Sequence, residues 1–389
     1  MSVPSWLYHR ILQHGGNIPF HQYMDWVLHD QDYGAYGAGS LQIGVKGDFV
    51  TSPSLGSSFA YLLALQIEQW LNSFGEEPIS LIETGPGEGH LALQLAQILY
   101  NNVPNFRNRL EIILIEPNKG MSQRQKNYLA KSPLPLRWCS LEKLSKDPIK
   151  GIILAHEVID AFAVERLTYY ENDWYRQRVA VIPDRMNNNE SKLILIRGER
   201  WGYYTPNIKG LGLYKRKTFP MKNGWCTELH TETLQWLNSC KKSLSQGYLL
   251  VIDYFIEASN YYSTRYSQGT IMTYKNQIAR TDPLQDPGKL DITCHICLET
   301  LLSAAAKNGW SFTGQALQGE ALLALGLAEQ FYCSKNKEKK NINFLINERE
   351  NMLRLVNPLG LGNFRWLVFN SNMQHSYPLF LNEPNGSSF

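Results

Sequence analysis

Residues 83–89 read Glu-Thr-Gly-Pro-Gly-Glu-Gly and follow a short apolar run. The glycines at alternate positions, Gly85, Gly87 and Gly89, permit positive φ angles and let a ligand lie against bare backbone. An amphipathic run begins at His90, and a helix start adds unpaired N–H groups and the positive end of the helix dipole. The segment therefore predicts a strand, a glycine turn and a helix that together bind a nucleotide-like ligand.

The glycine spacing narrows the choice of ligand. Dinucleotide-binding folds use G-x-G-x-x-G, whereas this chain has E-x-G-x-G-x-G, with Glu83 two residues before the first glycine. The pattern does not indicate a pyrophosphate, and it disfavours a nicotinamide dehydrogenase. It resembles the first motif of class I S-adenosylmethionine (SAM) methyltransferases, whose acid lies near the amino-acid end of the cofactor. A glycine-rich turn without a ligand is the alternative for this segment taken alone.

A second acid, Glu116, ends another apolar run, Leu110–Ile115, and Pro117 breaks that run before a helical pattern. In alternating βα folds, binding sites form at the carboxyl ends of the strands. A carboxylate at this place can accept both ribose hydroxyls of an adenosine cofactor. The alternative is an ordinary surface carboxylate at the end of a strand.

Glu157 follows the apolar run Gly151–Leu154, so it should lie at the same edge of the sheet. There it could hold a cationic substrate group and take up a proton. Asp160 is a second candidate for the catalytic site, but it could equally cap a following helix.

Asp291, Thr293 and His295 alternate, so their side chains would share one face of an extended segment. His295 could act as a base or as a hydrogen-bond partner, because an imidazole titrates near neutral pH. In the alternative interpretation, these residues form a network that only fixes a loop.

The elements that must position these residues can be read from the hydrophobic spacing. Helices are predicted at Ser5–His14, at Phe20–Leu28 and from Ser52-Pro53 to about Phe74, and strands at 79–83, 110–115, 134–138 and 151–155. This βα alternation predicts an α/β, doubly wound, mostly parallel sheet with helices on both faces. Three alternating runs, 167–170, 174–182 and 192–197, predict antiparallel strands, with a polar turn at 171–173 and a polar loop at 187–189.

The second half continues the α/β pattern. It predicts a helix at 229–244, a strand at 248–254, a long loop at 255–295, a helix at 296–308, a strand at 310–317, mostly helix at 319–355 and a strand at 362–369. We expect an N-terminal helical cap (1–77), a SAM-binding βα core (78–165), a β-rich insertion (166–228) and the remainder of the core (229–389) with a substrate-side loop.

The bulk properties limit the function classes. The 389 residues are 43% hydrophobic with a net charge of +3, so the charge gives no case for a nucleic-acid partner. The sequence has no membrane-length apolar run and no signal-peptide core, which predicts a cytoplasmic protein without membrane insertion. Cys294 and Cys297 form a single C-x-x-C pair, which supplies too few ligands for zinc. The basic cluster 335–340 is interpreted as a solvated loop.

Several segments in order along the chain resemble the MidA family of class I SAM-dependent methyltransferases, which includes a mitochondrial complex I assembly factor. The matching pieces are Tyr23-Met24, Tyr33–Tyr36, Gly47–Pro53, Glu83–Gly89, Trp138–Leu141, Glu157–Ala161, Asp282–Gly288, Asp291–His295 and Leu359–Phe364. The resemblance implies a Rossmann-like core that binds SAM, with Ser140 and Leu141 lining the adenine. It also implies a protein substrate, an arginine of a subunit of a complex I-type respiratory enzyme.

The chain departs from the family pattern on the expected substrate side. Ser54 and Tyr61 stand where the family has Glu, His156 stands for Asn, and Cys297 stands for Asp. The cofactor motif is intact, so the reaction is better determined than the substrate. A SAM-binding assembly factor without catalysis and a small-molecule methyltransferase are the alternatives.

Overall fold

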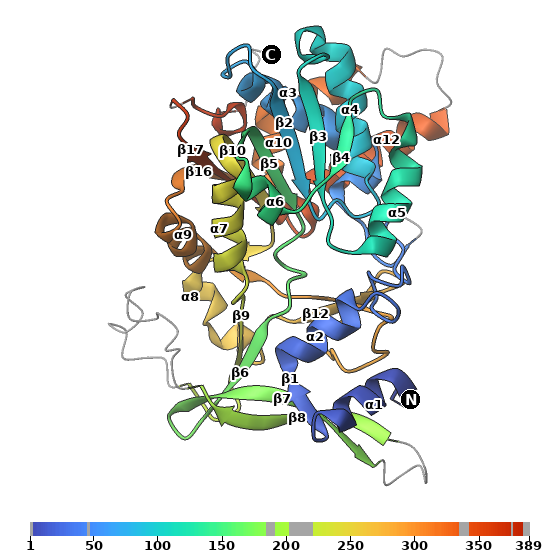
Figure 1. The fold of residues 1–389 in the computed structure, drawn as a ribbon, viewed down its shortest axis with the longest axis vertical. Coiled ribbons are helices and arrows are strands. Elements are labelled where there is room, and N and C mark those ends of the chain that lie inside the picture. The colour runs from blue at the N-terminus through green and yellow to red at the C-terminus, as the bar shows by residue number, and fades with distance from the viewer. Residues whose placement is uncertain are drawn as a thin grey trace. The chain divides into compact units, whose positions relative to one another are not determined.

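The structure is a computed structural model that describes residues 3–44, 47–183, 191–201, 221–333, 342–374 and 376–383 (Figure 1). The chain divides into two units, each made of three separate stretches. The first unit comprises Met1–Gln42, Ile159–Gln235 and Phe255–Ser303, and the second comprises Ile43–Val158, Trp236–Tyr254 and Ala304–Phe389.

The second unit contains a seven-stranded sheet in the order β16-β17-β10-β5-β2-β3-β4. Neighbours from β10 to β4 pair in parallel, whereas β17 and β16 pair antiparallel. The strands are β2 (Ile79–Thr84), β3 (Leu110–Ile115), β4 (Leu136–Trp138), β5 (Ile149–His156), β10 (Leu244–Asp253), β16 (Ser311–Leu317) and β17 (Arg365–Ser371). The predicted mostly parallel sheet is confirmed.

Apolar residues on both faces of the strands explain why helices cover both sides of this sheet. Leu81 and Leu154 belong to a core cluster shared with α3, whereas the adjacent Ile82 and Ile153 are fully buried on the opposite face. Figure 1 shows α6 and α7 in front of the sheet and α3 and α10 behind it. The helices are α3 (Ser58–Leu71), α4 (His90–Asn102), α5 (Lys119–Tyr128), α6 (Leu141–Lys146), α7 (Thr233–Ser243), α9 (Leu298–Lys307), α10 (Gln318–Ala324), α11 (Leu327–Cys333) and α12 (Ile342–Val356).

The first unit carries an antiparallel sheet in the order β1-β7-β6-β9, with β8 paired to β7. Glu171 and Asn172 join β6 to β7 with φ angles of 48° and 65°, as a two-residue hairpin turn requires. The antiparallel strands expected here are confirmed, whereas the polar loop 187–189 lies outside the described residues. The elements are α1 (Ser5–Gln13), β1 (Asn17–Pro19), α2 (Phe20–His29), β6 (Glu165–Tyr170), β7 (Asp173–Pro183), β8 (Ser191–Arg200) and β9 (Cys226–Leu229).

The prediction of a loop over 255–295 is wrong. This stretch forms a three-stranded antiparallel sheet in the order β13-β12-β14, together with α8 and the short strand β11, which pairs with β15 just beyond the stretch. Strands of two to four residues are too short to show a hydrophobic period, so the sequence pattern missed them. The elements are β11 (Phe255–Ile256), α8 (Ala258–Tyr261), β12 (Met272–Lys275), β13 (Ile278–Arg280), β14 (Asp291–Thr293) and β15 (Ile296–Cys297).

Three helix starts were also predicted wrongly. The helix expected from residue 296 begins at Leu298, because Ile296–Cys297 pair as β15. The helix expected from Ser52-Pro53 begins at Ser58 as α3. A short 3-10 helix at Ser52–Leu55, with Thr51 at its N-cap, precedes it, and Gly56 at φ 123° separates the two helices. The helix expected from Leu229 begins at Thr233, because the preceding residues pair as β9. Across the described ranges, no helix combines the length and the apolar character that crossing a bilayer requires.

Candidate functional site

The glycine loop lies between β2 and α4, as the sequence predicted. Gly85, Gly87 and Gly89 have φ angles of 61°, 54° and 88°, in the left-handed region that favours glycine. A Cβ atom would lie 3.0 Å from a Val158 methyl if added at Gly85, and 3.3 Å from the Ile43 side chain if added at Gly87. The loop therefore depends on glycine for its conformation as well as for ligand access.

Glu83 lies inside β2, one residue before the strand ends, and its side chain is buried. Burial raises the pKa of its carboxyl from 4.5 to about 8. Among the described residues, nothing forms a hydrogen bond with its Oε2 atom. A buried acceptor without a partner beside the glycine loop fits a cationic ligand group such as the ammonium of an amino acid.

Glu116 follows β3 directly, and two donors hold its carboxylate. Its Oε1 accepts the backbone N–H of Asn118 at 2.8 Å, and its Oε2 accepts Nε2 of Gln125 at 3.0 Å. Burial raises the pKa of Glu116, while these two hydrogen bonds oppose the rise. The carboxylate is fixed at the end of its strand, where ribose hydroxyls can be recognised.

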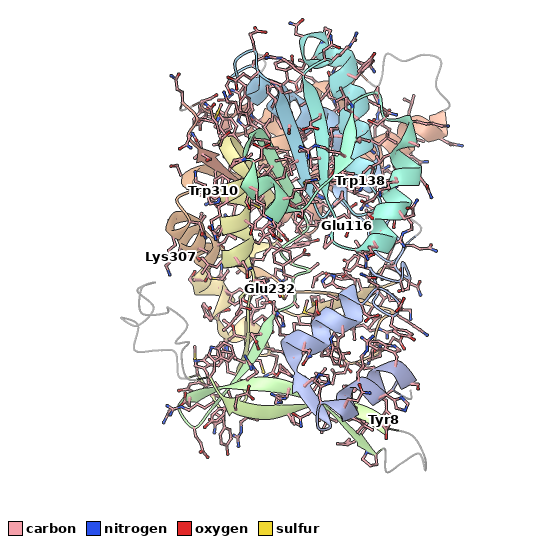
Figure 2. The ribbon with its side chains drawn as sticks, in the orientation of Figure 1. Tyr8, Glu116, Trp138, Glu232, Lys307 and Trp310 are labelled. Carbon is pink, nitrogen blue, oxygen red and sulfur yellow. The ribbon has the colours of Figure 1, made fainter. Side chains whose placement is uncertain are left out.

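Ser140 and Leu141 follow β4 and begin α6. The Ser140 hydroxyl caps this helix by accepting the N–H of Lys143 at 3.2 Å, and the carbonyl of Leu141 accepts the hydroxyl of Ser243 at 3.1 Å. Figure 2 labels Trp138 at the end of β4 and Glu116 after the neighbouring strand. Because β3 and β4 pair in parallel, the predicted adenine-side residues follow the strand next to the one that the predicted ribose-side acid follows.

The sequence reasoning missed Gln125, which is fully buried on α5. Its amide contacts the Gly87 carbonyl, the Glu116 carboxylate and the Trp138 indole. Nothing in the local sequence distinguishes this glutamine from its polar neighbours on the helix. Only the tertiary fold shows that it faces the strand ends.

Glu157 follows β5 as predicted, and it is a non-glycine residue at φ 53°. Its N–H donates to the carbonyl of Ile252 at 2.9 Å, and its side chain is 13% exposed. His156 Nε2 lies 3.4 Å from Glu157 Oε1, but burial lowers the His156 pKa to about 3. The imidazole is therefore neutral and the contact is not an ion pair. A left-handed non-glycine residue is a form of backbone strain that clusters at functional sites.

Asp160 and Asp291 belong to the first unit. The suggestion that Asp160 caps a helix is wrong, because no helix follows it and the chain turns directly into β6. Its backbone carbonyl accepts the N–H of Cys294 at 3.1 Å. Asp291 begins β14, is buried, and accepts the hydroxyl of Tyr36 at 2.8 Å.

His295 lies just beyond β14, also in the first unit. Its backbone N–H donates to the Thr270 hydroxyl at 3.1 Å, and burial lowers the pKa of its imidazole. Cys294 Sγ lies 3.4 Å from His230 Nε2. The part of the chain that the structure describes contains no group of three His, Cys, Asp or Glu residues arranged to hold a metal ion.

At three positions where the family has an acid, this chain has Ser54, Tyr61 and Cys297, and none of them provides a carboxylate. The Ser54 hydroxyl exchanges hydrogen bonds with the Thr51 backbone, donating to its carbonyl at 2.7 Å and accepting its N–H at 3.1 Å. The Tyr61 side chain is exposed on α3, and Cys297 is buried. Within the second unit, the structure thus gathers Glu83, the glycine loop, Glu116, Ser140–Leu141 and Glu157 at the carboxyl ends of β2, β3, β4 and β5, which we call the cofactor edge.

Comparisons with known proteins find methyltransferases among the relatives of this chain. A family model described as "Putative S-adenosyl-L-methionine-dependent methyltransferase" matches residues 62–316. A crystal structure of a Burkholderia thailandensis protein bound to S-adenosyl-homocysteine has a TM-score of 0.82 and 23% identity, covering 99% of this chain and 96% of that one. A native structure of a protein from the same organism has a TM-score of 0.77 and 21% identity, covering 99% of this chain and 96% of that one.

Two curated relatives have names that state a reaction. "Protein arginine methyltransferase NDUFAF7 homolog, mitochondrial" from Drosophila melanogaster is 24% identical over 80% of this chain and 74% of its own length. "Protein arginine methyltransferase NDUFAF7, mitochondrial" from Danio rerio is 26% identical over 48% of this chain and 47% of its own length. The chain thus spans about half the length of the vertebrate relative.

The fold and the cofactor edge define a SAM-dependent methyltransferase, an enzyme of the Rossmann-like class I type. The family model covers well over half of the chain. The chain belongs to this family of SAM-dependent methyltransferases, the MidA family that its sequence motifs resemble.

Proposed function

We propose that this enzyme is a protein arginine N-methyltransferase that acts on a subunit of a complex I-type respiratory enzyme. The names of the curated relatives support arginine as the acceptor, and the family resemblance supports the respiratory subunit. The observation that carries the proposal is the carboxylate of Glu157, which follows β5 at the same sheet edge as the cofactor residues.

An arginine acceptor needs a carboxylate at this edge. A guanidinium is a planar cation with five donors in a fixed fork, which a carboxylate can accept with both oxygens. The adjacent His156 contributes no positive charge, because burial holds its pKa at about 3. No positive charge on His156 therefore offsets a negative charge on Glu157, which would attract a guanidinium.

In this proposal, residues at different places along the cofactor edge have different roles. When bound, SAM supplies an activated methyl group on its sulfonium. Glu83 and the glycine loop hold the amino-acid half of the cofactor, and Glu116 holds the ribose hydroxyls. Glu157 orients the guanidinium and accepts the proton that the attacking nitrogen loses. The new nitrogen–carbon bond replaces the bond between the methyl carbon and the sulfonium sulfur, which leaves as a neutral thioether.

Transfer of labelled methyl groups to peptides tests this proposal. We expect an arginine peptide to be methylated and its lysine counterpart to remain unmodified. Glu157→Gln should reduce transfer at least about a hundredfold, as loss of a general base does, without changing the affinity for S-adenosylhomocysteine (SAH). Glu142→Gln is the matched control, because Glu142 is exposed on α6, where it pairs with Lys146 at 3.2 Å.

Two results would contradict the proposal. Full turnover by Glu157→Gln would remove Glu157 from proton uptake. Intact SAH binding without methylation of any arginine peptide or respiratory subunit would favour an assembly factor that binds the cofactor without transferring its methyl group.

A further inference from the structure

Gln125 connects three segments that meet at the cofactor edge. Its Nε2 donates to the carbonyl of Gly87 at 2.7 Å and to Oε2 of Glu116 at 3.0 Å. Its Oε1 accepts the indole N–H of Trp138 at 2.8 Å. The side chain has no exposed surface, so water does not replace any of these bonds.

The three partners allow only one orientation of the amide. The Gly87 carbonyl only accepts hydrogen bonds, and the Trp138 indole only donates them. Reversing the amide would place Oε1 against the Gly87 carbonyl and the NH₂ group against the indole N–H. Trp138 therefore selects the orientation in which Gln125 donates to both the loop and the acid.

We propose that Gln125 is a positioning residue for the adenosine half of the cofactor, held in its donating orientation by Trp138. By bonding Gly87 and Glu116 together, it fixes the glycine loop after β2 relative to the acid after β3. The cofactor then meets a preformed carboxylate and does not have to order one on binding. This inference rests on the cofactor site of the proposed function, but it does not depend on the acceptor.

The test measures binding of SAH and of methylthioadenosine by calorimetry. Methylthioadenosine lacks the amino-acid half, so equal losses for both probes place the effect at the adenosine end. We expect Gln125→Leu to weaken both by roughly tenfold or more, because the half-buried Glu116 carboxylate and the Gly87 carbonyl lose their shared donor. Trp138→Phe should weaken both by a smaller factor, because it removes only the donor that orients the amide.

Gln125→Glu distinguishes a positioning role from a purely structural one, because only a positioning role predicts that the probe affinity of this variant changes with pH. The new carboxylate would face Glu116 and the Gly87 carbonyl, so binding is penalised when both acids are ionised. Relative to the unaltered protein at each pH, its affinity should therefore fall as the pH rises from about 6 to 8 and recover when the pH is lowered.

Gln66→Leu is the matched control in the same unit. Gln66 is also fully buried on a helix, where it donates to Gln69 at 2.7 Å and accepts the N–H of Phe380 at 3.2 Å. We expect it to lower the thermal midpoint without changing either affinity. Unchanged probe affinities in folded Gln125→Leu and Gln125→Glu, or a pH-independent loss in the latter, would overturn the inference. Neither result would affect the arginine assignment, because these assays contain no acceptor.

Discussion

The two units of this enzyme assemble their candidate catalytic residues in different ways. In the second unit, Glu83, Glu116 and Glu157 each lie at the end of a strand in one parallel sheet. In the first unit, Asp291 and His295 lie on a three-residue strand and just beyond it, where they contact Tyr36 and Thr270 from remote parts of the chain.

The two units thus bring their polar residues together in two different ways. A parallel sheet brings strand ends together by topology alone, so each acid can be recognised from the apolar run before it. The polar residues of the first unit are placed by hydrogen bonds between segments that share no local pattern. We expect cofactor binding to depend on the strand ends of the second unit and not on the hydrogen bonds of the first.

The largest effect is expected at the glycine loop. Gly87→Val forces a branched side chain into a left-handed conformation at φ 54°, and its Cβ would stand at the cofactor edge. We expect SAH affinity to fall by at least about a hundredfold, measured by calorimetry. Gly75→Val is the control, because Gly75 is exposed and a Cβ there meets no atom within 4 Å. Unchanged SAH affinity in Gly87→Val would contradict the assignment of the glycine loop as a SAM-binding motif.

Removal of the ribose-side acid should have the next largest effect. Glu116→Ala should weaken SAH binding by about tenfold to a hundredfold through lost charge-assisted hydrogen bonds. Glu111→Ala is a control on the same strand, since Glu111 pairs with Arg137 at 2.8 Å at the opposite end of β3. Equal affinities for Glu116→Ala and the unaltered protein would mean that the ribose binds elsewhere.

Glu83 should make cofactor binding depend on pH. Its pKa is raised from 4.5 to about 8, so at neutral pH the free protein holds a proton there that the unfolded chain has released. This contribution to stability is complete below pH 4.5 and is lost as the pH rises toward 8.

A ligand ammonium group beside Glu83 favours the carboxylate, so SAH binding near neutral pH should release up to one proton. Calorimetry in buffers with different ionisation enthalpies measures this release directly. Glu83→Gln should abolish it. Binding that releases no proton in the unaltered protein would place the ammonium away from Glu83.

The smallest effect is expected in the first unit. Tyr36→Phe removes the hydroxyl that donates to Asp291, which should lower the free energy of unfolding by about 1–3 kcal/mol. SAH affinity should stay the same, because all predicted cofactor residues lie in the second unit. Tyr8→Phe is the control, because it removes the same kind of hydroxyl group from a side chain on α1 in the same unit (Figure 2). A clear loss of SAH affinity in Tyr36→Phe would mean that cofactor binding also depends on a hydrogen bond within the first unit.

The sequence by itself determined the parallel sheet, the glycine loop, the acid after β3 and the acid after β5. Each is local, because an apolar run followed by glycine or an acid marks the end of a strand. The same local reasoning failed for 255–295, where the strands are two to four residues long, and for Asp160, which is followed by a turn and not by the helix it could have capped.

Only the tertiary structure decided which polar groups are buried and which partners they meet. The raised pKa of Glu83, the neutral state of His156 and the three bonds of Gln125 all arise from burial among elements remote in sequence. The strained backbone of Glu157 likewise has no local sequence signal. Desolvation and hydrogen bonding depend on the surroundings of a side chain in three dimensions, and a linear pattern does not specify those surroundings.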